Sequence, residues 1–162
     1  MKRLLLAGLV VLMGTGGAMA QNSIVGKWKV ASVNAEGMTI DLEKPENTKK
    51  LLAAQFAKES GKEADSATIN QMYTMFTTVF QGMSIEFTKN GMGIFTMSNP
   101  RDGGVKNDTA TFTVDYAKGI MNTVSKEEGK EKHEQMNIKF EGEYLVMAKE
   151  EGETIRLKRS KQ

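Results

Sequence analysis

Apolar and polar side chains alternate along two parts of the chain, residues 24–42 and 83–160. This two-residue period is typical of strands with one buried face. Between these parts the apolar residues recur every three or four positions, which is typical of amphipathic helices. The pattern therefore predicts a mainly β protein with one helical insertion at about residues 45–81.

Two helices are predicted in the insertion. The first enters near Pro45 and stops at Gly61, and the second is capped near Asp65 and ends at Gly82. The apolar stripe of the second helix is the stronger one, and it comprises Ile69, Met72, Tyr73, Phe76, Val79 and Phe80. Each helix has an apolar side that another part of the protein must cover.

Eight strands are predicted, one before the helices and seven after them, at residues 24–33, 83–88, 92–97, 109–116, 120–125, 135–140, 144–148 and 154–160. A short extended piece at 38–42 precedes the helices. Asn90-Gly91 is a strong hairpin signal, because a type I′ turn needs positive φ at both central residues. Successive hairpins place sequence neighbours side by side, so we predict an antiparallel up-and-down barrel closed by its first and last strands.

The inward face of this barrel supplies most of the candidate ligand-binding residues, namely Met83, Ile85, Phe87, Phe112, Val114, Met136, Ile138, Phe140, Tyr144 and Val146. An eight-stranded barrel is just wide enough to be filled by side chains or to hold one small ligand, and both outcomes stay open here. Met72, Tyr73 and Phe76 of the second helix complete the candidate set, because they would touch a bound molecule if the helix caps the cavity. Alternatively, together with Phe80, they only cover the barrel wall or end.

An early Gly26-Lys27-Trp28, in the first strand of an eight-stranded meander that has an arginine in its last strand, resembles the lipocalin-like family, including exported bacterial members. The resemblance implies that the indole lies at the closed end of the barrel, with the late arginine packed across it. We expect this arginine to be Arg159 and not Arg156, because an antiparallel last strand finishes near the level where the first begins. The family has a long loop over the open mouth between its first and second strands, which implies a two-helix lid in this chain. Other short motifs of the family are not evident.

Residues 1–20 have the features of a secretory signal peptide: Lys2 and Arg3, an apolar run from Leu4 to Met13, and Ala18-Met19-Ala20. The run is shorter than the roughly 20 residues that span a bilayer, so we expect no membrane span. We expect residues 21–162 to form one exported domain, periplasmic or secreted and monomeric. The chain has no cysteine, so we expect neither disulfides nor a lipid anchor.

Charge and chemistry narrow the function further. Without Lys2 and Arg3 the 22 lysines and arginines become 20, equal to the 20 acidic residues, and this balance argues against a nucleic-acid partner. A lone His133 without cysteine excludes Cys/His catalysis and histidine-rich zinc sites.

The remaining candidates for chemistry are carboxylates and methionines. Glu86, Asp115 and Glu134 fall on polar strand faces, so we expect no enzyme activity. Met92 and Met97 could be copper ligands, but they fall on opposite faces of one strand, and we expect no metal or cofactor. We therefore expect an exported protein that carries a small apolar or amphipathic molecule. The alternative is a filled barrel that acts through protein–protein interaction.

Overall fold

The computed structural model of the protein describes residues 23–35, 37–98, 103–149 and 152–161. The elements are β1 (Gly26–Ala35), β2 (Met38–Asp41), α1 (Pro45–Ser60), α2 (Ser66–Gln81), β3 (Ser84–Phe87), β4 (Met92–Ser98), β5 (Val105–Asp115), β6 (Ile120–Glu127), β7 (Lys130–Glu141), β8 (Tyr144–Ala148) and β9 (Thr154–Arg159). The predicted signal peptide lies outside the described residues.

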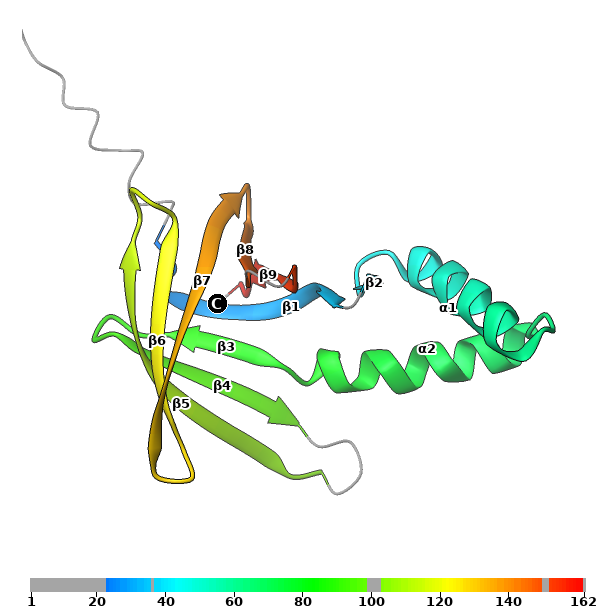
Figure 1. Ribbon diagram of the computed structural model, residues 1–162, viewed down its shortest axis with the longest axis horizontal. Helices are drawn as coiled ribbons and strands as arrows, with labels where there is room; N and C mark the ends of the chain where they lie inside the picture. The colour runs from blue at the N-terminus through cyan, green and yellow to red at the C-terminus, as the bar shows by residue number, and fades with distance from the viewer. Residues whose placement is uncertain (1–22, 36, 99–102, 150–151, 162) are drawn as a thin grey trace, which may run out of the picture.

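Eight antiparallel strands, β1 and β3 to β9, form a closed barrel, as predicted (Figure 1). Each of the strands from β3 to β9 pairs with its neighbour in sequence, and β9 returns to pair with β1 from Trp28↔Arg159 to Asn34↔Thr154. Closure leaves no long unpaired edge in this ring, because the first and last strands satisfy each other's backbone groups.

The short strand β2 and the strand β3 pair with the same edge of β1. β2 pairs with residues 32–35 of β1, and β3 pairs with residues 26–29 of the same edge. β2 and β3 are therefore two halves of one interrupted barrel strand. The helices enter at this interruption, after the short extended piece predicted at 38–42.

A core of buried side chains surrounds Trp28 at the closed end of the barrel. Trp28 is 1% exposed, and its indole N–H donates to the carbonyl of Ile24 at 2.7 Å. The guanidinium of Arg159 lies 4.3 Å from the indole ring centroid and donates to the carbonyl oxygens of Val25, at 2.9 Å, and Ser23. The expected packing of Arg159 across the tryptophan is confirmed.

Gly26 is required by this arrangement. Its φ of 132° is a conformation that side chains rarely adopt, and a Cβ there would lie 2.7 Å from Nη1 of Arg159. The glycine of the Gly26-Lys27-Trp28 motif thus leaves the space through which the guanidinium reaches the indole.

The two helices form an arm that projects from one side of the barrel (Figure 1). The carboxylate of Asp65 caps α2 by accepting from the backbone N–H of Thr68 at 2.7 Å, and Gly61 ends α1 in the left-handed conformation. α1 contacts α2 and β2, while α2 makes few contacts with β1. The lid expected over the mouth is therefore absent from the described residues, because the helices pack against each other.

The arm is fixed at its root. Thr48, which is fully buried in the first turns of α1, accepts a hydrogen bond from the backbone N–H of Asp41 and donates to its carbonyl. The carboxylate of Asp41 accepts from the N–H groups of Glu43 and Lys44 at 2.9 Å each. These bonds tie α1 directly to the end of β2.

Candidate ligand site at the open end of the barrel

Much of the barrel interior is filled. Its core cluster contains Ile24, Trp28, Val30, Phe87, Met121, Ile138, Leu145, Met147 and Leu157. All the predicted interior residues from β3, β5 and β7, and Met83 just before β3, lie in this cluster or pack against it: Met83, Ile85, Phe87, Phe112, Val114, Met136, Ile138 and Phe140. Phe87 and Phe112 meet edge to face with ring centroids 5.1 Å apart. Most of these side chains therefore form a packed core.

Two predicted interior residues, Tyr144 and Val146, lie on the opposite face of β8. Leu145 pairs with the inward Phe140, and Met147 pairs with Ile138, so Leu145 and Met147 face the core. The prediction for this strand was wrong by one position, and with a two-residue period a shift of one residue exchanges the faces completely.

Tyr144 instead joins a polar cluster on the outer wall. The guanidinium of Arg156 lies 3.6 Å from the tyrosine ring centroid, and the tyrosine hydroxyl donates to Glu43 at 2.7 Å. Glu43 also accepts from the ammonium of Lys158 at 2.7 Å. The hydrogen bond from Lys158 lowers the pKa of Glu43 most, and the hydrogen bond from Tyr144 lowers it further. In return, the Glu43 carboxylate raises the pKa of Lys158 and of Tyr144.

The predicted helical residues Met72, Tyr73 and Phe76 are half-buried in the arm and are not among the side chains that pack against the barrel core. Of the predicted stripe only Phe80, in the last turn of α2, reaches that core. Tyr73 lies under the ammonium of Lys49 from α1, 5.4 Å from its ring centroid. The arm and the barrel interior therefore form separate apolar surfaces.

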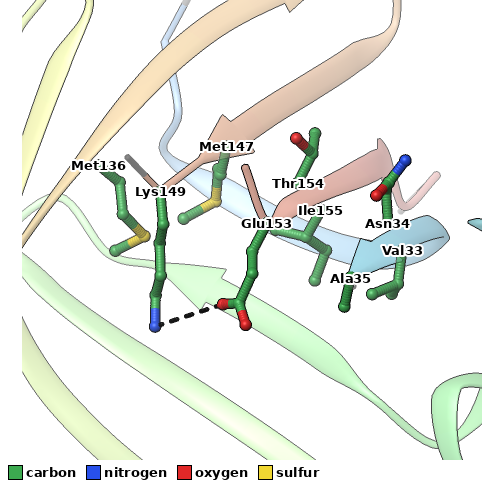
Figure 2. Close-up of a pocket in the computed structure, with 9 residues that line it drawn as sticks. All are labelled: Val33, Asn34, Ala35, Met136, Met147, Lys149, Glu153, Thr154 and Ile155. Atoms are coloured by element: carbon green, nitrogen blue, oxygen red, sulfur yellow. Dashed lines mark ion pairs between the residues drawn. The ribbon is translucent and has the colours of Figure 1, made fainter. Parts of the chain in front are cut away.

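The candidate site is a cavity of about 180 Å³ at the open end, where β8 ends and β9 begins. It is lined by Val33, Asn34, Ala35, Met136, Met147, Lys149, Glu153, Thr154 and Ile155. Figure 2 shows the side chains of Met136 and Met147 close together on one side, with Lys149 and Glu153 extending from the neighbouring strand ends. Met136 was predicted as a ligand-binding residue, and the other lining residues were not.

No residue of β1 was among the predicted ligand-binding residues, and a β-bulge in β1 determines which of its side chains face inward. The pairing of β1 with β9 shifts between Val30 and Ser32, so Ala31 is an extra residue. Strict alternation from Trp28 would aim Ser32 and Asn34 inward. After the bulge Val33 lies opposite Ile155 and packs against the core.

Charged side chains form a rim beside this cavity. Glu134 lies on the same face of β7 as Met136, two residues away, and not on the polar outer face where it was predicted. Its carboxylate contacts the ammonium groups of Lys132 at 3.4 Å and Lys149 at 3.5 Å. Lys149 also contacts Glu153 at 3.9 Å.

The difference in strand length leaves this end open. β7 has 12 residues but pairs with β8 only from Asn137 to Glu141, because β8 has five. The first half of β7 therefore extends beyond β8, and its inward side chains reach the solvent. The site combines an apolar floor with a polar rim that water can reach.

A second hollow of about 360 Å³ lies at the β5–β6 turn and is lined by Tyr116, Ala117, Lys118, Gly119, Ile138, Lys139 and Phe140. Its lining comes from one turn and three consecutive residues of β7. Side chains of facing strands do not converge there, and this makes the open-end cavity the better candidate.

Neither a metal-binding cluster of histidine, cysteine or acidic side chains nor a membrane-spanning helix is found in the part of the chain that the structure describes. No cluster of three or more histidine, cysteine or acidic side chains could hold a metal ion there. No helix in these ranges has the length and apolar character needed to cross a membrane.

Comparison with known proteins shows a fold but no family. The structure is similar to that of a DUF4847 family protein from Bacteroides vulgatus, with a TM-score of 0.51 and 16% sequence identity over 85% of this chain and 94% of that protein. At this identity the likeness shows a shared fold. No family model matches the chain, and no curated protein matches it.

Proposed function

We propose that this protein binds a small amphipathic molecule at the open end of its barrel, without catalysing a reaction on it. The observation that carries the proposal is the cavity itself, whose floor of Val33, Met136, Met147 and Ile155 adjoins the charged pair Lys149–Glu153. Flexible and polarizable methionine side chains adapt to apolar ligands of varied shape.

The cavity volume limits the ligand. An apolar cavity of roughly 150 Å³ accepts benzene, whereas sites for drug-sized molecules occupy about 300–1,000 Å³. At about 180 Å³ the cavity accommodates one ring or a short alkyl chain. A larger ligand would leave its remaining part in the solvent beside the rim.

The lipocalin-like relationship is part of the proposal. The closed eight-stranded barrel and the packing of Gly26, Trp28 and Arg159 support it. The resemblance places the tryptophan at the closed end, and eight-stranded barrels such as lipocalins can hold one small ligand, so we expect a ligand at the other end. The cavity lies at that end of this barrel, where the β8–β9 connection is found.

Methionine methyl spectroscopy tests ligand binding directly. We would label the methionine methyl groups with ¹³C and titrate the protein with toluene. We expect the Met136 and Met147 resonances to shift together and saturably, while Met75, which is 63% exposed on the arm, stays unchanged. Ala35→Phe should fill the cavity and abolish the shifts, whereas the matched change Ala54→Phe on α1 should not. Unchanged Met136 and Met147 resonances at saturating toluene would contradict the proposal.

We further propose that the protein is exported, periplasmic or secreted, after cleavage behind Ala20. Support comes from the basic start, the apolar run and the small-residue site of residues 1–20. Cell fractionation and mass analysis of the recovered protein test this. A cytoplasmic protein that retains residues 1–20 would refute it.

A second candidate function, partner binding through the helical arm, is favoured by the surface of α2. This 16-residue helix contains no charged side chain, and Met75 and Val79 are exposed by 63% and 37%. Met75 and Val79 are one helical turn apart, so their side chains are neighbours on the helix surface. α2 packs against α1, which the root bonds hold in place, and exposed apolar patches mark interaction surfaces.

The interrupted strand permits a clean test of the arm. Asp41 lies opposite Ser32 and Ser84 opposite Lys29, so two residues suffice to join β2 to β3. We would delete residues 43–82 and thereby connect Leu42 to Met83. The barrel should still fold and bind toluene, and a partner that uses the arm should be lost. A Met75→Glu variant that keeps every partner of the intact protein would refute the arm's role.

A further inference from the structure

The charged side chains of the rim form a row of consecutive ion pairs. Glu127 contacts Lys132 at 3.3 Å, Lys132 contacts Glu134, Glu134 contacts Lys149, and Lys149 contacts Glu153. Each lysine therefore lies between two carboxylates. This row begins and ends with a carboxylate, and in the described residues it carries three negative charges and two positive ones.

Glu153, at one end of this row of ion pairs, is the carboxylate of the row that lines the cavity. Among the ion pairs of the described residues it has one partner, Lys149, at the long distance of 3.9 Å. Lys149 is already shared with Glu134 at the shorter distance of 3.5 Å. A cation at the cavity would meet an under-compensated carboxylate, while an anion would meet an ammonium group that two carboxylates already neutralise.

The polar groups on the other side of the cavity do not reverse this preference. The amide of Asn34 donates to the hydroxyl of Thr39 at 2.9 Å, so one of its donors is engaged. Thr154 and the cavity floor carry no charge. Among the described lining residues, Lys149 and Glu153 are the charged ones, and they therefore decide the sign of the charge that the ligand carries.

We propose, resting on the proposed function, that the ligand is a small organic cation. Its amine, charged at neutral pH, contacts the carboxylate of Glu153. Its apolar part, of about six carbon atoms by comparison with a benzene-sized cavity, lies against Met136 and Met147. The thioether sulfurs suit this position because they are polarizable next to a cation.

Three probes with the same alkyl chain test the charge preference: n-hexylamine, 1-hexanol and hexanoate. Each is titrated into the ¹³C-methyl-labelled protein at neutral pH and low salt, and the shifts of Met136 and Met147 report occupancy. We expect hexylamine to bind most tightly and hexanoate most weakly. Because the rim is half exposed, the preference for hexylamine over hexanol should be about two- to fivefold, and it should shrink in high salt.

Glu153→Gln assigns the preference to one residue. This variant should lose most of the advantage of hexylamine, about two- to fivefold, while its affinity for hexanol stays unchanged. The matched control is Glu131→Gln, since Glu131 is 61% exposed and pairs with His133 away from the cavity. The control should keep the full preference for the amine.

The outcomes separate the two proposals. Equal binding of the three probes at Met136 and Met147 would leave the binding function standing and overturn the cationic ligand. Tightest binding of hexanoate, or an amine preference that survives in Glu153→Gln, would also overturn it. If neither toluene nor any of the three probes shifts the methyl resonances of Met136 and Met147, the binding function itself is refuted.

Discussion

Replacing Arg159 by methionine should destabilise the closed end of the barrel specifically. The change removes the guanidinium 4.3 Å from the Trp28 ring centroid, a contact worth about 0.5–2 kcal/mol. It also removes two charge-assisted hydrogen bonds, to the carbonyl oxygens of Val25 and Ser23, each worth about 1.5–3 kcal/mol when well buried. Arg159 is only partly buried, so we discount the sum to about 3 kcal/mol, or a fall in Tm of about 10 °C.

Arg156→Met is the matched control, because Arg156 lies in the same strand but faces the outer wall. It loses a stacking contact with Tyr144 and an ion pair of 3.8 Å with Glu141, which at this more exposed position together should cost about 1–2 kcal/mol. Urea unfolding followed by tryptophan fluorescence measures both variants, since Trp28 is the single tryptophan of the chain. Folded Arg159→Met should also show red-shifted emission. Equal destabilisation of the two variants, with unchanged emission, would refute the role assigned to Arg159.

Three further predictions concern stability. Gly26→Ala should cost about 1–3 kcal/mol more unfolding free energy than Gly142→Ala. Both glycines have positive φ, but only Gly26 lies against a side chain. Thermal melts compare the two variants, and equal melting temperatures would contradict the prediction. Leu145→Ala should cost about 2–5 kcal/mol and Tyr144→Ala much less in urea titrations, and the reverse order would contradict the observed face of β8. The lowered pKa of Glu43 stabilises the folded state at pH above its ordinary value of 4.5, and this stabilisation is lost as the pH falls; Glu43→Gln should therefore flatten the acid side of the stability profile, and an unchanged profile would count against the outer cluster.

Much of the fold could be predicted from the sequence because barrel strands obey a simple period. Alternation gave the strand order, and Trp28 with a late arginine gave the closing pair. β5 and β7 proved longer than predicted, since their first halves, Val105–Thr109 and Lys130–Glu134, carry mainly polar side chains on both faces. An alternating apolar pattern cannot reveal strand residues that extend beyond the buried core, because neither face of the strand is apolar there.

The site was less accessible to prediction than the fold. The face of β8 depends on how many residues make the β7–β8 turn, and an apolar run such as Tyr144–Ala148 fits either face. The bulge at Ala31 changes the inward set of β1 without any glycine or proline to mark it. Helix orientation was out of reach for another reason: the apolar stripes require a covering surface, but α1 and α2 provide it for each other.

The charged rim and the apolar floor follow from one property of β7, its length relative to β8. Along the inward face of β7, Ile138 pairs with β8 and belongs to the packed core, and Met136, one residue beyond that pairing, packs against the core. Glu134 and Lys132 lie further from the paired segment and are not among the residues of this core. Inward charged side chains cost little there because they remain in contact with water and with each other. A longer β8 would bury the same carboxylate and lysine inside the barrel at a cost of several kcal/mol. The short β8 is therefore what allows a polar rim to adjoin an apolar floor, and the amphipathic character of this site follows from strand length as much as from residue type.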